Sequence, residues 1–356
     1  MCGRRDHAPV TGAAPVTSKS FETGGPLYWE KGANGGPVKI HGRSVKVLFR
    51  NDDYNPSTAR QRCKELAEGE KTFLLIGGAG TDQIKSCADY AATKGIPYLS
   101  AGVTETPLAS NPVYFGLSMT YKAQGTLLAQ YVKNVLHATD PSKVAAIVTA
   151  TPNFEDALNS FKAAMGPIKV IRPSKTADGA TYSNSICSGP TKLYPTVFVL
   201  TSPTFFLQLE GAATCNPQYV GVGISMGLDE VADIGCKSPF GSMHGAQFFS
   251  PFPAFGDTAS KDPAFTKAGG ADDIEYALWG LSKTLAAMLE RAGKDLSRQG
   301  FIKAVASAKG ISSGVFPPLN FSPTDHFGAD QTYVLKAVCE GATGHYETLK
   351  PLSSSF

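Results

Sequence analysis

The sequence predicts an α/β protein of two similar lobes, each built around a doubly wound parallel sheet. Short apolar or β-branched runs alternate with amphipathic helices, a pattern typical of parallel strands joined by helical crossovers. The pattern starts a second time near residue 120. The chain has 356 residues, whereas a single hydrophobic core seldom serves more than about 250–300 residues. Two lobes are therefore expected.

The first series of elements lies ahead of residue 120. Continuous apolar runs predict strands that are buried on both faces, and the turns after them lead into helices. Pro56 suits the first position of a helix because proline lacks the N–H that such a position leaves unpaired. The predicted strands are 45–49, 73–76 and 96–100, and the predicted helices are 56–68 and 82–94.

The second series repeats this pattern without repeating the sequence. Its predicted helices are 124–136, 154–165 and 204–213, and its predicted strands are 144–148, 196–200 and 219–222. Apolar residues from Ile274 to Leu289 recur at spacings of three, four and seven, which predicts one long helix with a buried face. The run 332–338 predicts a last strand, and Glu340–Gly341 predicts a hairpin-like turn after it.

Composition and motifs argue against several function classes. The net charge of +3 comes without a concentrated basic stripe, so we expect no nucleic-acid partner. No apolar run approaches the roughly 20 residues of a membrane span, and the first residues lack the pattern of an export signal. Six scattered histidines and seven cysteines lack metal-ligand spacing, so neither a metal nor a cofactor is expected. Neither the nucleophile elbow of a hydrolase nor a phosphate loop is expected, and no placed acid or base indicates an enzyme.

Two turns after neighbouring strands suit a carboxylate. The turn Gly77–Thr81 precedes a helix whose first N–H groups have no partner within the helix, and the Thr81 hydroxyl adds a donor. The turn Ser100–Thr104 offers small residues and hydroxyls in the same way. Ligands of open α/β sheets bind beyond the carboxyl ends of strands, so both turns are expected to face one ligand. A dinucleotide is not expected, because Gln83 replaces the third glycine of the nucleotide fingerprint.

Several further motifs, in their order along the chain, resemble the leucine/isoleucine/valine-binding family of type I periplasmic binding proteins. Members of this family are the solute-binding components of ABC importers. The resemblance extends over nearly the whole chain. Its motifs are Asn34–Gly36, His41–Arg43, Asp52–Asp53, Ile76–Thr81, Gly95–Thr104, Phe115–Gly125 and Tyr276–Gly293.

The resemblance implies a Venus-flytrap architecture of two lobes joined by three crossovers. It places the first lobe at residues 1–118 and 251–322, and the second at 119–250 and 323–356. It implies a binding protein and not an enzyme, which closes on a small carboxylate-bearing ligand and is then recognised by ABC permease subunits. A ligand-sensing receptor domain of the same fold and a Rossmann-like enzyme are the alternatives.

The resemblance also implies a location outside the cytoplasm. We expect a monomer that is exported by a signal peptide to the periplasm or another extracytoplasmic space. A lipid anchor in the native form is a further expectation, with Cys2 as the candidate for attachment.

Ligand contacts are implied residue by residue. Phe154 matches a position where the family often has an aromatic contact, and the stretch Thr17–Phe21 would form the lip of the first lobe. The expected ligand-binding residues are Ser18, Phe21, Gly80, Thr81, Ser100, Gly102, Thr104, Phe154, Ser225, Met226, Gln247 and Phe249.

One departure from the family pattern bears on the ligand. Members that bind amino acids usually place an acidic residue after the strand that ends here at 222, against the ligand ammonium. This chain has Ile224–Met226 there, which weakens the amino-acid assignment because a buried ammonium without a partner is costly. Asp229, Glu155 and Asp156 are candidates to replace that acid. Phe249 and Phe252 are candidates to line a pocket for an apolar or aromatic acid.

The cysteines are interpreted as disulfides because export is expected. Cys63 and Cys87 each lie on a predicted helix that follows one of two neighbouring strands, and Cys187 and Cys215 bracket a strand-helix unit. Buried free thiols are the alternative. The predicted pairs are Cys63 with Cys87 and Cys187 with Cys215; Cys236 with Cys339 would remain, and Cys2 is left over.

Overall fold

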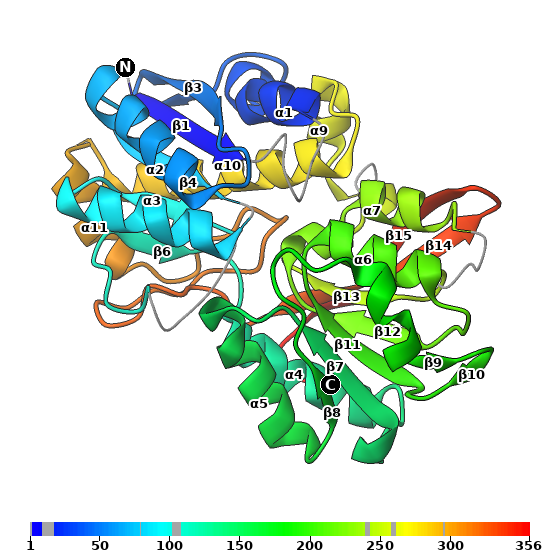
Figure 1. Cartoon of the computed structure of the whole chain (residues 1–356). Helices are drawn as coiled ribbons and strands as arrows, with labels where there is room; N and C mark the ends of the chain where they lie inside the picture. Colours follow the sequence, from blue (N-terminus) through cyan, green and yellow to red (C-terminus); the bar gives the residue numbers. More distant parts are fainter. Residues whose placement is uncertain are drawn as a thin grey trace. The chain divides into compact units, whose positions relative to one another are not determined.

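The computed structural model (Figure 1) describes residues 2–8, 18–78, 80–101, 108–238, 243–257, 261–294 and 296–356. The chain forms two compact units. Unit 1 consists of Met1–Met119 and Phe255–Gln331, and unit 2 consists of Thr120–Ala254 and Thr332–Phe356. The chain therefore passes three times from one unit to the other, and both units are α/β, which confirms the predicted fold class.

Unit 1 is built on a six-stranded sheet of order β2-β3-β1-β4-β5-β6. All neighbours from β3 to β6 are parallel, and only β2 runs antiparallel to β3. The strands are β1 (Cys2–Ala8), β2 (Lys39–Ile40), β3 (Arg43–Asn51), β4 (Leu74–Gly77), β5 (Tyr98–Ser100) and β6 (Tyr114–Gly116).

Helices of unit 1 begin where the sequence supplies capping side chains. The Asn55 side chain accepts hydrogen bonds from the N–H groups of Ser57 and Thr58, directly around Pro56. Asp272 caps the long helix α10 by accepting from the N–H of Glu275 at 2.8 Å. The helices are α1 (Ser18–Lys31), α2 (Pro56–Lys64), the π-helix η1 (Glu65–Gly69), α3 (Thr81–Thr93), η6 (Phe255–Asp257), α9 (Pro263–Ala268), α10 (Asp273–Ala292) and α11 (Arg298–Ala306).

Unit 2 is built on a seven-stranded sheet of order β15-β14-β13-β12-β11-β7-β8. Neighbours from β8 to β13 are parallel, and β14 and β15 add an antiparallel hairpin. Every residue of β7 and β11 is buried, as their continuous apolar sequences predict. The strands are β7 (Val144–Val148), β8 (Lys169–Ile171), β11 (Thr196–Leu200), β12 (Gln218–Gly221), β13 (Gln247–Ser250), β14 (Thr332–Glu340) and β15 (Thr343–Ser353).

The remaining elements of unit 2 connect these strands. Thr120 caps α4 by accepting from the N–H of Ala123 at 3.2 Å, and Ser202 caps α6 by accepting from the N–H of Phe205 at 3.3 Å. A separate two-stranded ribbon consists of β9 and β10. These elements are α4 (Tyr121–Asn134), η2 (Pro141–Lys143), η3 (Pro152–Phe154), α5 (Glu155–Met165), η4 (Gly179–Ser185), β9 (Cys187–Ser188), β10 (Thr191–Lys192), α6 (Pro203–Ala212), η5 (Ile224–Gly227) and α7 (Asp229–Gly235).

The unit boundaries differ from the expected ones by one residue at the first crossover and by more at the other two. Residues 323–331, expected in the second lobe, belong to unit 1. There Phe327 forms a β-bridge with Gly116, and the His326 ring stacks on Phe115 at 4.6 Å. Residues 251–254, expected in the first lobe, belong to unit 2, where the N–H of Ala254 donates to Thr348 Oγ1 at 2.9 Å.

Helix α1 was not predicted as a helix, because Gly24, Gly25 and Pro26 interrupt its pattern. Close packing against α10 explains the glycine at 24. A Cβ on Gly24 would lie 2.8 Å from the Cα of Glu275. Ser20 Oγ also donates to the Asp272 carboxylate at 2.5 Å. Tertiary contact therefore supports this helix where intrinsic propensity does not.

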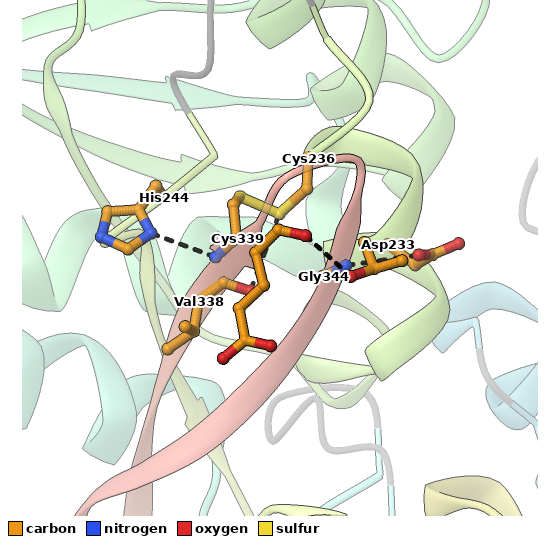
Figure 2. Close-up of a disulfide and its surroundings, with 8 residues drawn as sticks. Asp233, Cys236, His244, Val338, Cys339 and Gly344 are labelled. Atoms are coloured by element: carbon orange, nitrogen blue, oxygen red, sulfur yellow. Dashed lines mark hydrogen bonds between the residues drawn. A yellow bond between two sulfur atoms is a disulfide. The ribbon is translucent and has the colours of Figure 1, made fainter.

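Three disulfides join the six cysteines after Cys2. Cys63 on α2 bonds to Cys87 on α3, and Cys187 on β9 bonds to Cys215 after α6. Figure 2 shows the third bridge, which ties Cys236 at the end of α7 to Cys339 in β14. The first two bridges are the predicted pairs, and the third joins the two cysteines that were expected to remain after them. Each stabilises the fold chiefly by restricting the unfolded chain.

Candidate functional site

The carboxyl ends of three parallel strands meet at one edge of the unit 1 sheet. Strands β3, β4 and β5 end at Asn51, Gly77 and Ser100. Because β4 pairs in parallel with β5, and β1 pairs in parallel with both β3 and β4, the segments after these strands emerge on the same side. In open α/β sheets this is the edge where ligands bind.

The turn after β4 presents backbone in place of side chains. Gly78 has a φ of 83°, a left-handed conformation that favours glycine, and Gly80 is the N-cap of α3 without a side chain to cap it. Thr81 begins α3 and is 7% exposed. By helix geometry the first N–H groups of α3 have no intrahelical acceptor, so this turn can bind an anion. Gly80 and Thr81 thus lie at the start of α3, and an anion site there stays a prediction.

Tyr54 lies beside this turn, and the sequence analysis did not single it out. A Cβ on Gly80 would lie 2.9 Å from the Tyr54 ring and 2.2 Å from Gln83 Oε1. Burial, with the nearby carboxylates of Asp82 and Asp52, raises the pKa of Tyr54 to about 12. The phenol is therefore neutral over the physiological range and keeps its proton for donation.

The second predicted turn is only partly described. Ser100 is 1% exposed at the end of β5, and the carbonyl of Ala101 accepts from Ser118 Oγ. Gly102 and Thr104 lie outside the described residues. Ser18 begins α1, and Phe21 in the same helix stacks on Phe49 of β3 at 5.9 Å. Phe21 thus packs on β3, the strand that ends at the edge.

Unit 2 has a corresponding edge at the carboxyl ends of β7, β11 and β12. The Phe154 ring meets the Tyr121 ring at 5.7 Å, nearly edge to face. A Cβ on Gly223, just after β12, would lie 3.8 Å from the Tyr121 hydroxyl. The structure therefore brings Phe154 together with Tyr121 and the turn after β12. Tyr121 was missed, although its place directly after the N-cap Thr120 offered a signal.

Ser225 and Met226 lie in η5, which follows β12 at this edge. Met226 is 1% exposed, and its carbonyl accepts from the Tyr346 hydroxyl at 2.7 Å. Gly223–Gly227, however, has the glycine and serine spacing of a hydrolase nucleophile elbow, so the expectation that this motif is absent is wrong. An elbow needs its serine in a strained turn, whereas Ser225 is not among the positive-φ residues and sits within a 3₁₀ turn.

Gln247 and Phe249 are not brought to this edge. Gln247 begins β13, three residues before the strand ends, and its side chain accepts from the Tyr131 hydroxyl at 2.6 Å. A strand rises about 3.3 Å per residue, so Gln247 lies well below the edge. Phe249 is 1% exposed and packs on the rings of Tyr131 and Phe356. Both residues therefore belong to the core of unit 2. The sequence does not reveal this, because it does not show the register of β13.

The carboxylates suggested as partners for a ligand ammonium are engaged elsewhere. Asp229 Oδ1 accepts from the N–H of Tyr346 at 2.7 Å. Glu155 forms an ion pair with Arg172, and Asp156 also interacts within the protein. Phe252, which was a candidate to line the pocket, is a core residue like Phe249, because it is only 1% exposed. The edge of unit 2 thus contains the rings of Phe154 and Tyr121 and a turn, Ile224–Met226, that has no acidic residue.

Neither a metal centre nor a membrane-spanning helix occurs in the described residues. Across the described part of the chain, no three histidine, cysteine, aspartate or glutamate side chains are grouped so as to hold a metal ion. None of the helices in the described ranges has the length and apolar character needed to span a bilayer.

Two α/β units, each with an open sheet edge suited to a ligand, define a two-lobed binding protein. The sequence profile described as periplasmic binding protein matches residues 8–343. The chain belongs to the periplasmic binding protein family, as its motifs predict, and it is a binding protein and not an enzyme. Among curated protein sequences, none matches the chain.

Solved structures share this fold over nearly the whole chain. The first is a solute-binding protein of an ABC transporter from Rhodopseudomonas palustris BisB5 in complex with 3,4-dihydroxybenzoic acid, with 16% identity, a TM-score of 0.77, and coverage of 100% of this chain and 98% of that one. A fatty acid ABC transporter substrate-binding protein from Thermomonospora curvata has 18% identity, a TM-score of 0.81, and coverage of 100% and 92%. The branched-chain amino acid binding protein LivJ from Streptococcus pneumoniae, in complex with isoleucine, has 15% identity, a TM-score of 0.76, and coverage of 99% and 100%.

Proposed function

We propose that this protein is the solute-binding component of an ABC importer and captures a small organic acid that lacks an ammonium group. The observation that carries the proposal is the turn after β12, where Ile224–Met226 contains no acid. The candidate replacements Asp229 and Glu155 already have partners in the protein. An ammonium buried at this edge would therefore find no acid in the turn after β12, and a buried ammonium without a counter-charge is costly.

The ligand carboxylate would be held by unit 1. Gly80, Thr81 and Ser100 supply backbone N–H groups and hydroxyls at the edge, and Gly102 and Thr104 remain predicted contacts. The body of the ligand would rest on unit 2, against Phe154 and Tyr121. Closure of the two units on the ligand is favoured when contacts to both are available. In this proposal Ser18, Phe21, Ser225 and Met226 border the site.

The ligands of proteins with this fold support an acid of this kind. The R. palustris proteins are described in complex with 3,4-dihydroxybenzoic acid, 4-hydroxybenzoate and benzoate, and another is a fatty acid transporter component. LivJ is described with isoleucine, so the fold by itself does not select the ligand. The edge of unit 2 in this chain favours the acids over the amino acid.

The proposal includes a place and a partner. The protein would work as a monomer outside the cytoplasm, and permease subunits in the membrane would recognise its closed form. Import is preferred over a sensing role because the structures named above are transporter components. A lipid anchor at Cys2 stays a prediction.

Thermal unfolding with added ligands tests the proposal. Benzoate or hexanoate should raise the unfolding temperature of the purified protein, because a ligand at 100 times its Kd adds about 2.7 kcal/mol. Leucine should give no shift at the same concentration. Greater stabilisation by leucine, or a shift with ATP alone, would contradict the proposal.

A variant pair links the binding to the site. Phe154→Ala removes the half-buried ring at the edge of unit 2 and should weaken binding of the stabilising acid at least tenfold in calorimetry. Phe255→Ala removes another half-buried ring, which contacts Phe265 in unit 1, and should leave the affinity unchanged. Equal effects of the two substitutions would count against a ligand at Phe154.

A further inference from the structure

Two polar atoms at the edge of unit 2 are buried without a hydrogen-bond partner. They are Thr151 Oγ1 and Arg172 Nη1. Thr151 is only 5% exposed, and although it is the N-cap of η3 its side chain caps nothing. Buried polar groups in folded proteins are nearly always paired, so each of these atoms calls for an explanation.

The sheet brings these two residues to the same edge of unit 2. Strands β7 and β8 run parallel with Ile147 beside Ile171, and the N–H of Ala150 donates to the carbonyl of Pro173 at 2.8 Å beyond the strand ends. Thr151 and Arg172 therefore emerge together at the carboxyl edge of the sheet. They do so next to Phe154, whose N–H donates to the Thr151 carbonyl at 3.2 Å.

Glu155 fixes one side of the Arg172 guanidinium and leaves the other side unused. Arg172 Nη2 donates to the Glu155 carboxylate, while Nη1 has no acceptor. The Arg172 side chain as a whole is 27% exposed, whereas its Nη1 atom is buried. A guanidinium only donates hydrogen bonds, and it keeps its charge at any physiological pH. The atom that would satisfy Nη1 is therefore an acceptor such as oxygen.

We propose that Arg172 and Thr151 form a second polar recognition point of the ligand site, which binds an oxygen at the end of the ligand remote from its carboxylate. The proposal rests on the proposed function and narrows it. Because the rings of Phe154 and Tyr121 lie beside this point, the favoured ligand class is an aromatic acid with a ring hydroxyl. Arg172 donates to the hydroxyl oxygen, and the Thr151 hydroxyl, which both donates and accepts, pairs with the same group.

Matched acids that differ by one hydroxyl test this proposal in calorimetry. The probes are 4-hydroxybenzoate against benzoate, and 6-hydroxyhexanoate against hexanoate. The protein should bind 4-hydroxybenzoate at least tenfold more tightly than benzoate, because a site built to hydrogen-bond a hydroxyl rejects the analogue without it. Equal affinity for both members of each pair would overturn the recognition point and leave the proposed function standing. Binding of none of the four acids would overturn the proposed function itself.

Three variants assign the preference to residues. Thr151→Val replaces the unpaired hydroxyl by a methyl group of similar size, so it should fold, and it should reduce the hydroxyl preference at least fivefold while benzoate affinity stays within twofold. Arg172→Met should do the same. Arg62→Met breaks a comparable ion pair, that of Arg62 with Glu65 in unit 1, and should leave the preference intact. A preference that survives in both the Thr151 and the Arg172 variants would refute the assignment.

Discussion

Removing the disulfide between Cys236 and Cys339 should destabilise the protein more than its local surroundings suggest. The bridge joins α7 to β14, and the short distance of 5.4 Å between the two Cα atoms shows that the elements are in direct contact. Around it, the N–H of Cys339 donates to His244 Nδ1 at 3.1 Å and the N–H of Gly344 donates to Asp233 at 3.3 Å (Figure 2). Those two bonds remain when the cysteines are replaced, so the main loss is in the unfolded chain.

The length of the closed loop sets the magnitude. This bridge spans 103 residues, and the chain-entropy relation gives about 4.7 kcal/mol for a loop of that length. The bridge between Cys63 and Cys87 spans 24 residues, for which the relation gives about 3.4 kcal/mol. The longer loop, however, contains Phe255–Gln331 of unit 1. If unit 1 stays folded while unit 2 unfolds, about 26 residues remain flexible and the value falls to about 3.5 kcal/mol.

Urea unfolding separates these cases, because the two tryptophans, Trp29 and Trp279, both lie in unit 1. Tryptophan fluorescence therefore follows unit 1, and far-ultraviolet circular dichroism follows both units. The Cys236→Ala/Cys339→Ala variant should lose about 4–5 kcal/mol with coincident transitions, or about 3.5 kcal/mol with the fluorescence transition unmoved. The Cys63→Ala/Cys87→Ala variant is the matched control. A clearly smaller loss for the long loop than for this control would refute the reasoning.

Two further predictions concern unit 1. Gly80→Ala places a Cβ against Gln83 and the Tyr54 ring, so it should lower the free energy of unfolding by about 1–3 kcal/mol in urea and weaken acid binding. The control is Gly211→Ala, whose Cβ meets nothing within 4 Å and which should leave the stability unchanged or raise it. Equal effects of the two substitutions on stability would contradict the predicted crowding at Gly80. Burial lowers the pKa of His326, so the folded state binds fewer protons than the unfolded state and stability should fall as the pH drops below about 6.5. His326→Gln should flatten this dependence between pH 7.5 and pH 5, and the exposed His137→Gln should not.

The parts of the fold visible in the sequence are those fixed by local chemistry. Strands such as β7 are continuous apolar runs, and helices such as α2 begin at a capping side chain followed by proline. Helix α1 and strand β1 were not predicted, because tertiary contacts and not local sequence determine them. The sequence of β1 is Cys-Gly-Arg-Arg-Asp-His-Ala, which has no strand pattern, and it is a strand because β3 and β4 pair with it on both sides.

In the candidate site, too, the residues set by local sequence could be predicted, and those set by tertiary pairing could not. The anion site at Gly80 and Thr81 could be predicted because it depends on a local feature, a glycine turn before a helix. Thr151 and Arg172 were missed because only the pairing of β7 with β8 brings them together. Gln247 was misplaced because its position depends on the register of β13, which a run of apolar residues does not reveal.

The interleaved order of the two units has a consequence for biosynthesis. Unit 1 gains its last helix, α11, at residue 306 and is complete only at residue 331, and the β13 edge of unit 2 waits for β14 beyond that point. At about 5–20 residues per second, a ribosome needs roughly 20–70 seconds to reach that residue. Throughout this interval the nascent chain contains no complete unit. A protein with contiguous domains would lock its first domain early, whereas this one postpones both until translation is almost finished.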